Sequence, residues 1–243
     1  MPRFPRKPGR PRDEALVARR RDEILDVAVA VFAEHGYRLT DVQVIADRLS
    51  LGKGTVYRYF PTKEALFLAA VDRGMRRLQS AIDEQVEAEA DPVEQMRRAV
   101  EAYLAYFDTQ PELVELLMQE RAEFKDRKQS TYFFYVDQCR ADRRERIKAL
   151  QAEGLMRKLP PDRIIDVMDN VMYGAIFTNH FAGRRKSFQQ QADEILDVVM
   201  YGCFEPGDRE TLKANSRTET RKRPGGSRAG KRKAGQTRRK ASS

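Results

Sequence analysis

Hydroxyl, phenol and basic side chains gather between residues 53 and 63 in a set that suits a polyanion. The set comprises Lys53, Thr55, Tyr57, Arg58, Tyr59 and Lys63. Hydroxyl and ammonium groups donate hydrogen bonds to phosphate oxygens, and such contacts fix the position of a protein on a nucleic-acid backbone. An Arg side chain can also donate two hydrogen bonds to a guanine edge. The chemistry indicated is nucleic-acid binding.

Two short helices joined by a turn are expected to position these side chains. In residues 41–49, apolar side chains recur at the i, i+3, i+4 and i+7 positions from Val42, which is the stripe of a buried helix face. Thr40 and Gln43 have the spacing of a capping box at the start of that helix. The periodicity stops at residues 50–52, where we expect the chain to turn.

Residues 53–60 are expected to form the second helix, with Val56 and Phe60 buried and the polar side chains projecting. In a helix-turn-helix, the second helix enters the DNA major groove. The alternative is a helical hairpin inside an ordinary bundle, with its polar residues merely solvated.

Residues 19–68 resemble the DNA-binding domain of the TetR family of bacterial one-component regulators. The resemblance covers about a fifth of the chain and is most specific between Lys53 and Leu66. The family often has Gly and then Ser in the turn, whereas this chain has Ser50 and Gly52. We therefore expect Ser50 to adopt a left-handed conformation, which Gly tolerates more easily. The matching residues are Ile24, Leu25, Ala28, Phe32, Gly36, Tyr37, Ile45, Ala46 and the runs 53–60 and 62–66.

The DNA-binding candidates divide into two groups by chemistry. Phosphate contacts are expected mainly from Thr40, Lys53, Tyr57, Tyr59 and Lys63. Base contacts are expected from Gln43, Thr55 and Arg58, because Gln suits adenine and Arg suits guanine. Gly54, within the matched run, is assigned to the same surface.

The charge is unevenly distributed along the chain. Of the net charge of +9, residues 1–21 carry +6 and residues 213–243 carry +11, which leaves −8 for residues 22–212. The cations are thus concentrated where they can reach a polyanion. The expected organisation is a basic disordered arm (1–14), a helix-turn-helix domain (15–68), a helical effector-binding and dimerisation domain (69–207) and a basic disordered tail (208–243).

The arm holds five basic residues and no acid between Arg3 and Arg12. Residues 8–12 resemble the core of an AT-hook, so Arg10 and Arg12 are expected to contact a narrow A·T-rich minor groove. The alternative is a disordered start that helps only solubility. For the tail, the expectation is non-specific attraction to nucleic acid that weakens with salt.

The fold expected for the chain is all-α, with about nine helices, because no segment alternates convincingly like a strand. Helices 161–182 and 188–204 are apolar on more than one side, so each needs more than one covering surface. The TetR resemblance implies that these two helices form a four-helix bundle with a second subunit. The alternative is a helix central to a monomeric bundle. Expected interface residues are Val171, Ala175, Ile195 and Val199. The other expected helices are 15–35, 41–49, 53–60, 63–88, 92–108, 111–124 and 129–153.

Aromatic and Met side chains with intermittent polar groups could line a cavity for a small organic effector. Ordinary core packing has the same composition. The candidates are Phe107, Met118, Phe124, Tyr132, Tyr135, Asp169, Met172, Tyr173 and Phe177.

Several functional classes are not supported by the sequence. No apolar run approaches the ~20 residues of a membrane span, and the first residues lack the apolar segment of a signal peptide, so a cytoplasmic location is expected. Cys139 and Cys203 are expected to be small hydrophobes rather than a redox or metal pair. The two His residues have no nucleophile motif beside them, and no Gly-rich phosphate loop is present. We therefore expect no enzyme activity, cofactor or metal.

The function expected from sequence is that of a homodimeric, sequence-specific transcriptional regulator. The TetR resemblance implies a repressor that a small molecule releases from its operator, by a shift of the long helix at residues 63–88. The alternatives are an architectural protein and a ligand-blind DNA-binding protein.

Overall fold

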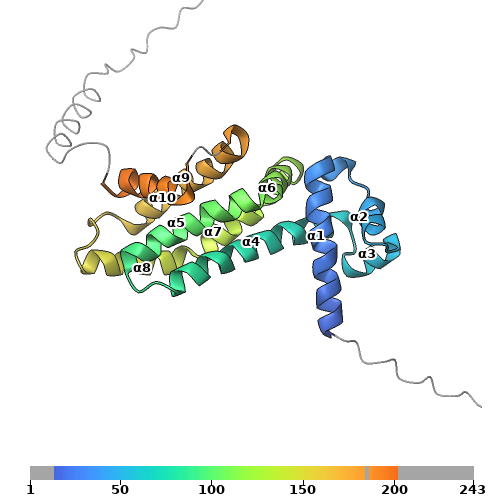
Figure 1. Cartoon of the computed structure of the whole chain (residues 1–243), viewed down its shortest axis with the longest axis horizontal. Helices are drawn as coiled ribbons and strands as arrows, with labels where there is room; N and C mark the ends of the chain where they lie inside the picture. The colour runs from blue at the N-terminus through green and yellow to red at the C-terminus, as the bar shows by residue number, and fades with distance from the viewer. Residues whose placement is uncertain (1–13, 184–185, 202–243) are drawn as a thin grey trace, which may run out of the picture. The chain divides into compact units, whose positions relative to one another are not determined.

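A computed structural model describes residues 14–183 and 186–201, and every regular element in these ranges is helical (Figure 1). The expectation of an all-α fold is therefore confirmed. The elements are α1 (Glu14–Leu39), α2 (Val42–Arg48), α3 (Lys53–Tyr59), α4 (Lys63–Glu87), α5 (Pro92–Thr109), α6 (Pro111–Glu123), α7 (Thr131–Gln138), α8 (Arg140–Ala152), α9 (Pro161–Ala182), α10 (Phe188–Leu196) and a π-helical turn, η1 (Asp197–Tyr201). None of these helices is long and apolar enough to span a membrane.

The first three helices share a core that fixes the orientation of α3. Ile24, Ala28 and Phe32 of α1 are fully buried, as are Ile45 of α2 and Val56 of α3. A buried helix face of this kind contributes most of the stability of short helices, because helices of seven residues are marginal by themselves. Packing against α1 therefore holds α2 and α3 in place.

The capping box expected at Thr40 is wrong by one residue. The N-cap of α2 is Asp41, whose carboxylate accepts a hydrogen bond from the Gln43 backbone N–H at 2.8 Å. The Thr40 hydroxyl donates instead to the Gly36 carbonyl at 2.7 Å, and Thr40 is only 3% exposed. An ionised Asp is at least as good a cap as Thr, and Thr40 is used to close the end of α1.

Both turns of the helix-turn-helix domain contain residues with positive φ. Ser50 has φ of 53°, which confirms the left-handed conformation expected from the exchange of Gly for Ser in this turn. Gly36 has φ of 77° and ψ of 157°, so the regular part of α1 ends where the sequence predicted, although the backbone hydrogen bonds resume up to Leu39.

The long helix α4 connects this domain to the rest of the chain. It contacts α1, α5, α6 and α7, and Figure 1 shows it passing from α1 alongside α5. The Thr62 side chain caps its start by accepting a hydrogen bond from the Ala65 N–H at 2.9 Å. At Gly74 the helix approaches α6 so closely that a Cβ atom would lie 2.5 Å from a methyl carbon of Leu113.

The expected boundaries of the later helices hold where a Pro or a cap marks them. Pro92, Pro111 and Pro161 each open a helix, and the Asp91 and Ser187 side chains cap α5 and α10. The single helix expected at 129–153 is instead two helices, α7 and α8, divided at Cys139. The ψ angle of Cys139 is −7°, and no Gly or Pro in the sequence marks this break. The end of the expected helix 188–204 lies outside the described residues.

Candidate nucleic-acid interface and ligand cavity

Helix α3 buries one side and presents the other to solvent. Val56 and Phe60 are 0% and 2% exposed, whereas Gly54, Tyr57 and Arg58 are exposed at i, i+3 and i+4 positions of one face. A Cβ atom added at Gly54 would meet nothing within 4 Å, so this face is open. Thr55 and Lys53 are half-buried beside it. The exposed face therefore offers hydrogen-bond donors to a partner outside the chain.

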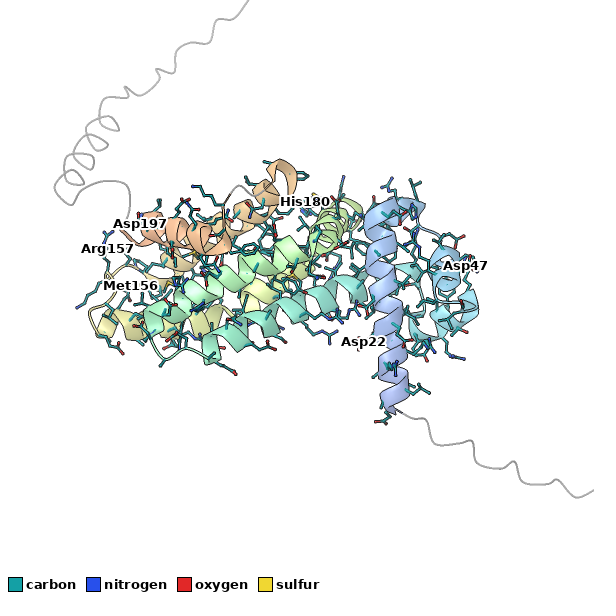
Figure 2. The ribbon with its side chains drawn as sticks, in the orientation of Figure 1. Asp22, Asp47, Met156, Arg157, His180 and Asp197 are labelled. Atoms are coloured by element: carbon teal, nitrogen blue, oxygen red, sulfur yellow. The ribbon has the colours of Figure 1, made fainter. Side chains whose placement is uncertain are left out.

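The starts of α2 and α3 meet at Asp41. The Lys53 ammonium group lies 2.6 Å from the Asp41 carboxylate, which also caps α2. The hydrogen bond from the Gln43 N–H, followed by the one from Lys53, lowers the pKa of Asp41. Gln43 is exposed, and its side-chain amide donates to Asp47, which lies at the outer surface of α2 (Figure 2). Lys53 and Gln43 thus lie at the same end of the motif.

Lys63 closes the end of α1 in the described chain. Its ammonium group donates hydrogen bonds to the carbonyls of Tyr37, Arg38 and Thr40 at 2.8, 3.1 and 3.1 Å, and lies 4.7 Å from the centre of the Tyr37 ring. Because an ammonium group has three protons, these carbonyls account for all its donors. Whether Lys63 and Thr40 also contact phosphate stays a prediction.

Two arginine side chains at α3 lie close to aromatic rings. The Arg58 guanidinium carbon lies 5.6 Å from the centre of the half-buried Tyr59 ring, while Arg21 of α1 lies 4.4 Å from the ring of Phe60. Arg21 was not among the candidates predicted from the sequence. Its place in the run of three arginines at residues 19–21 could have indicated it. Arg10 and Arg12 lie outside the described residues.

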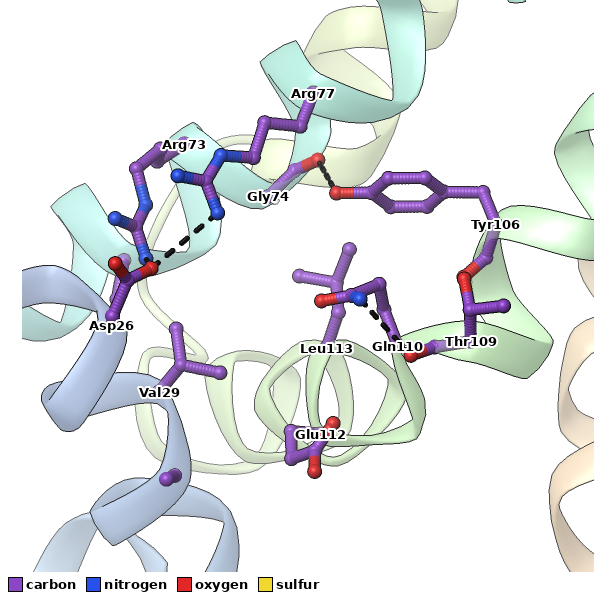
Figure 3. Close-up of a pocket in the computed structure, with 12 residues that line it drawn as sticks. Asp26, Val29, Arg73, Gly74, Arg77, Tyr106, Thr109, Gln110, Glu112 and Leu113 are labelled. Carbon is purple, nitrogen blue, oxygen red and sulfur yellow. Dashed lines mark hydrogen bonds and ion pairs between the residues drawn. The ribbon is translucent and has the colours of Figure 1, made fainter. Parts of the chain in front are cut away.

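A pocket of about 320 Å³ lies where α1, α4 and the α5–α6 turn meet (Figure 3). The buried Arg73 of α4 donates to the Asp22 carbonyl at 2.8 Å and pairs with the Asp26 carboxylate at 2.7 Å. Arg77 also reaches Asp26, at 3.4 Å. Burial lowers the pKa of Arg73, although the nearby carboxylates oppose the change. These contacts tie α4 to α1.

A larger cavity of about 470 Å³ lies among α4, α5, α7, α8 and α9. Its wall is mostly apolar and includes four methionines, a flexible side-chain type that fills irregular spaces. The volume is in the range of small-molecule sites. The methionines are Met75, Met96, Met168 and Met172.

Of the nine residues expected to bind a ligand, Tyr135 and Met172 line this cavity. Tyr132 and Asp169 are adjacent to it through hydrogen bonds or ion pairs with the lining residues Tyr103 and Arg143. The other five lie elsewhere, in α6, at its end or on other helix faces: Phe107, Met118, Phe124, Tyr173 and Phe177.

Sequence reasoning missed the walls that α4 and α8 contribute to the cavity. In α4, apolar side chains of the wall recur every four residues, at Leu78, Ile82 and Val86. In α8, the wall residues Ile147 and Leu150 are three positions apart. That periodicity was a readable signal of an inward face. It could not reveal that the face borders a cavity rather than filled core.

The expected interface residues lie on α9 and the segment after it. Ala175, Ile195 and Val199 are half-buried and pack on a cluster that includes Met168 and Ala192. Gly174 is exposed, and a Cβ atom there would meet nothing within 4 Å. Exposed apolar side chains flank this face: Val167, Phe181 and Val198. Elsewhere on α9, His180, which Figure 2 labels, pairs with Glu115 of α6 at 2.7 Å.

No group of His, Cys, Asp and Glu arranged to hold a metal ion occurs in residues 14–183 and 186–201. In the same ranges Cys139 is half-buried, and its thiol contacts the Gln79 side-chain oxygen at 2.9 Å. Burial raises the pKa of the Cys139 thiol. Cys203 lies outside the described residues.

Comparison with known proteins identifies the N-terminal domain. Residues 24–70 match the family model described as bacterial regulatory proteins, tetR family. The transcriptional regulator HbdR of Aromatoleum sp. (strain CIB) is 33% identical over 98 residues, covering 40% of this chain and 43% of HbdR. The transcriptional repressor KstR of Mycobacterium tuberculosis is 35% identical over 77 residues, covering 32% and 35%. The chain thus spans less than half the length of either relative.

The fold also has solved counterparts that cover about three quarters of the chain. The crystal structure of a transcriptional regulator FadR from Bacillus subtilis in complex with stearoyl-CoA superposes with a TM-score of 0.62 at 16% identity, covering 75% of this chain and 99% of that one. At this identity the likeness concerns the fold alone.

The fold and the site define an all-α protein whose N-terminal helix-turn-helix presents an open second helix. Residues 24–70 of that domain match the model of the TetR family of bacterial regulatory proteins.

Proposed function

We propose that this protein is a homodimeric, sequence-specific DNA-binding regulator of transcription that a small molecule releases from its operator. The observation that carries the proposal is the open face of α3, where Gly54, Tyr57 and Arg58 project from a helix held by buried Val56 and Phe60. The relatives named a regulator and a repressor support the same function, and repression is the mode proposed here.

The contacts divide by side-chain chemistry. We assign phosphate contacts to Lys53, Tyr57 and Tyr59, together with the Thr40 and Lys63 pair at the end of α1, and base contacts to Gln43, Thr55 and Arg58. A phosphate near Lys53 would compete with Asp41, whose carboxylate holds the ammonium group at 2.6 Å in the free chain. This competition favours release once the DNA contacts weaken.

Two subunits are needed for this mode of reading. Dimeric helix-turn-helix proteins place their reading helices in successive major grooves about 34 Å apart. The half-exposed face of α9, α10 and η1 around Val171, Ala175, Ile195 and Val199 supports a two-fold interface there, and the exposed Gly174 permits close approach of two helices.

The cavity of about 470 Å³ is the proposed effector site. Helix α4 lines it with Met75, Leu78 and Ile82, and the same helix is tied to α1 through Arg73. An effector that fits better when α4 is displaced would shift the protein toward a state that does not bind the operator, and operator DNA would weaken effector binding by the same factor.

The test begins with DNA fragments selected by the protein from a random pool. Arg58→Ala should lose discrimination between a selected site and its mutated versions, because each well-placed base contact discriminates by about 1–3 kcal/mol. Arg76→Ala removes the same charge from α4, where Arg76 is 61% exposed and pairs with Asp72, and should leave discrimination unchanged. Equal weakening on all sequences would make Arg58 a phosphate contact.

Two further outcomes separate the rival functions. An architectural protein would bind selected and random DNA almost equally, whereas a ligand-blind regulator would bind specifically but would not be released by any cavity ligand. Sedimentation of Gly174→Arg, compared with the wild type, tests the dimer, because a long charged side chain at that open position would block close helix approach.

A further inference from the structure

Two tyrosine hydroxyls form a hydrogen-bonded pair at the wall of the larger cavity. Tyr103 of α5 lines the cavity, and its hydroxyl lies 2.8 Å from that of Tyr132 of α7, which is 4% exposed. Each hydroxyl carries one proton and can accept two hydrogen bonds. One proton is shared between the two oxygens. Neither hydroxyl has another partner among the described residues, so the second proton is available to a ligand.

Both phenols stay neutral, so the pair acts as a donor at every physiological pH. Burial is the main cause that raises the pKa of Tyr103 well above its usual range and the pKa of Tyr132 to about 12. When Tyr132 donates to Tyr103, the proton of Tyr103, a residue of the cavity wall, is left for a ligand. The two hydrogen bonds would then form a short chain in which each polarises the other.

The charged side chains of the cavity wall are mostly acidic or paired with one another. Arg143 lines the wall but pairs with Asp169 at 2.6 Å, so it offers no free charge to a ligand. The exposed charged residues of the wall are three acids and one base: Asp83, Asp142, Glu153 and Arg146. This balance disfavours an anionic ligand, and the apolar wall disfavours a strongly polar one.

We propose that the cavity selects neutral, largely apolar molecules that carry a carbonyl oxygen, which accepts a hydrogen bond from the Tyr103 hydroxyl while Tyr132 donates to Tyr103. As a statement about effectors, this inference rests on the proposed function. As a statement about binding, it depends only on the cavity and can be measured without DNA.

Three probes of similar size isolate the contact: acetylnaphthalene, ethylnaphthalene and naphthoate. Equilibrium dialysis against the full chain gives the affinity of each. The wild type should bind acetylnaphthalene most tightly. Its carbonyl loses hydrogen bonds to water on entering the cavity, and the hydrogen bond from the Tyr103 hydroxyl replaces them. Naphthoate should bind weakest, because the three exposed acids of the wall outnumber its one exposed base, Arg146.

Tyr103→Phe removes the proposed donor hydroxyl and should shift the ratio of acetylnaphthalene to ethylnaphthalene affinities about tenfold, equivalent to 1.4 kcal/mol. The variant should then bind ethylnaphthalene more tightly than acetylnaphthalene. Burying a carbonyl without a hydrogen bond costs free energy, whereas burying an ethyl group carries no such cost. Tyr132→Phe is the matched control. It removes the same atom from the neighbouring ring but leaves Tyr103 free to donate, so the carbonyl preference should persist.

Each contrary outcome has a distinct meaning. Equal affinities of the wild type for acetylnaphthalene and ethylnaphthalene, absence of binding by both, or tightest binding of naphthoate would overturn the inference. A carbonyl preference that survives Tyr103→Phe would also overturn it. If acetylnaphthalene binds as expected but does not release the protein from its selected DNA site, the inference about the cavity stands and the effector role of the proposed function fails.

Discussion

Lys63 stabilises the end of α1, and replacing it with Met should destabilise the folded chain measurably. Met keeps the apolar stem of the side chain but removes the ammonium group and its three hydrogen bonds to the Tyr37, Arg38 and Thr40 carbonyls. The last carbonyls of a helix have no partner within it, so Lys63 supplies what the helix lacks. The Gly36 kink brings these carbonyls within reach of one side chain.

The size of the effect follows from the surroundings. A hydrogen bond to a charged group contributes about 1.5–3 kcal/mol when buried. Lys63 is half-buried, and water can replace part of its contacts, so the full value does not apply three times. A cation at a helix end contributes about 0.3–1 kcal/mol, and its contact with the Tyr37 ring a similar amount. We expect a loss of about 1–2 kcal/mol for Lys63→Met.

Urea unfolding followed by circular dichroism measures this loss directly. In a thermal scan the same loss would lower the midpoint by about 2–4 °C per kcal/mol for a chain of this size. Lys53→Met is the control, because it removes an equal charge that is paired with Asp41 at the surface. It should leave the midpoint unchanged and instead reduce the salt dependence of DNA binding.

An unchanged midpoint for Lys63→Met would refute the reasoning, because three carbonyls cannot lose a common donor without cost if the contacts persist in solution. The salt dependence of DNA binding by the same variant decides its second role. A slope reduced by about one phosphate contact would support the expected phosphate contact of Lys63 in addition to the cap.

Three more predictions concern local geometry and acidity. Ser50→Gly should raise stability by about 1 kcal/mol in urea unfolding, because φ of 53° strains every residue with a Cβ atom. Gly74→Val should cost about 1–3 kcal/mol through the clash with Leu113. Adding Leu113→Ala should then cost less than the sum of the two single changes. In a Cys203→Ser background, Cys139 should react with a thiol reagent more slowly than free cysteine and reach half its maximal rate at higher pH, since burial raises its pKa. A rate profile equal to that of free cysteine would contradict this burial.

The sequence predicted best those features that depend on near neighbours in the chain. The left-handed Ser50 followed from one residue exchange in a short turn, and the caps at Asp91 and Ser187 followed from residues two or three positions away. The error at α2 had the same local origin, since Thr40 and Asp41 are both good caps. The Thr40 hydroxyl donates a hydrogen bond to the Gly36 carbonyl, which leaves Asp41 as the cap.

Features set by distant parts of the chain could not be predicted in the same way. The division of α7 from α8 has no Gly or Pro to mark it, and the Cys139 thiol there contacts Gln79, sixty residues earlier. The larger cavity exists because five helices leave a space between them, so aromatic composition pointed to Tyr135 and Met172 but also to residues that pack elsewhere, such as Phe124. Periodicity identifies a buried face without revealing what it faces.

Polar contacts join α1 and α4 at two places along α4, and they link any movement at the cavity to the exposed face of α3. Lys63 holds the end of α1, and Arg73 holds Asp22 and Asp26 nearer its start. The two residues are ten positions apart on α4, which is about 15 Å along a helix. A helix fixed at two points cannot slide past its partner without breaking one of them, so α1 and α4 must move together. The close contact of Gly74 with Leu113 lies on α4 between Lys63 and the residues that line the cavity, so a displacement of α4 at the cavity would also disturb its packing on α6.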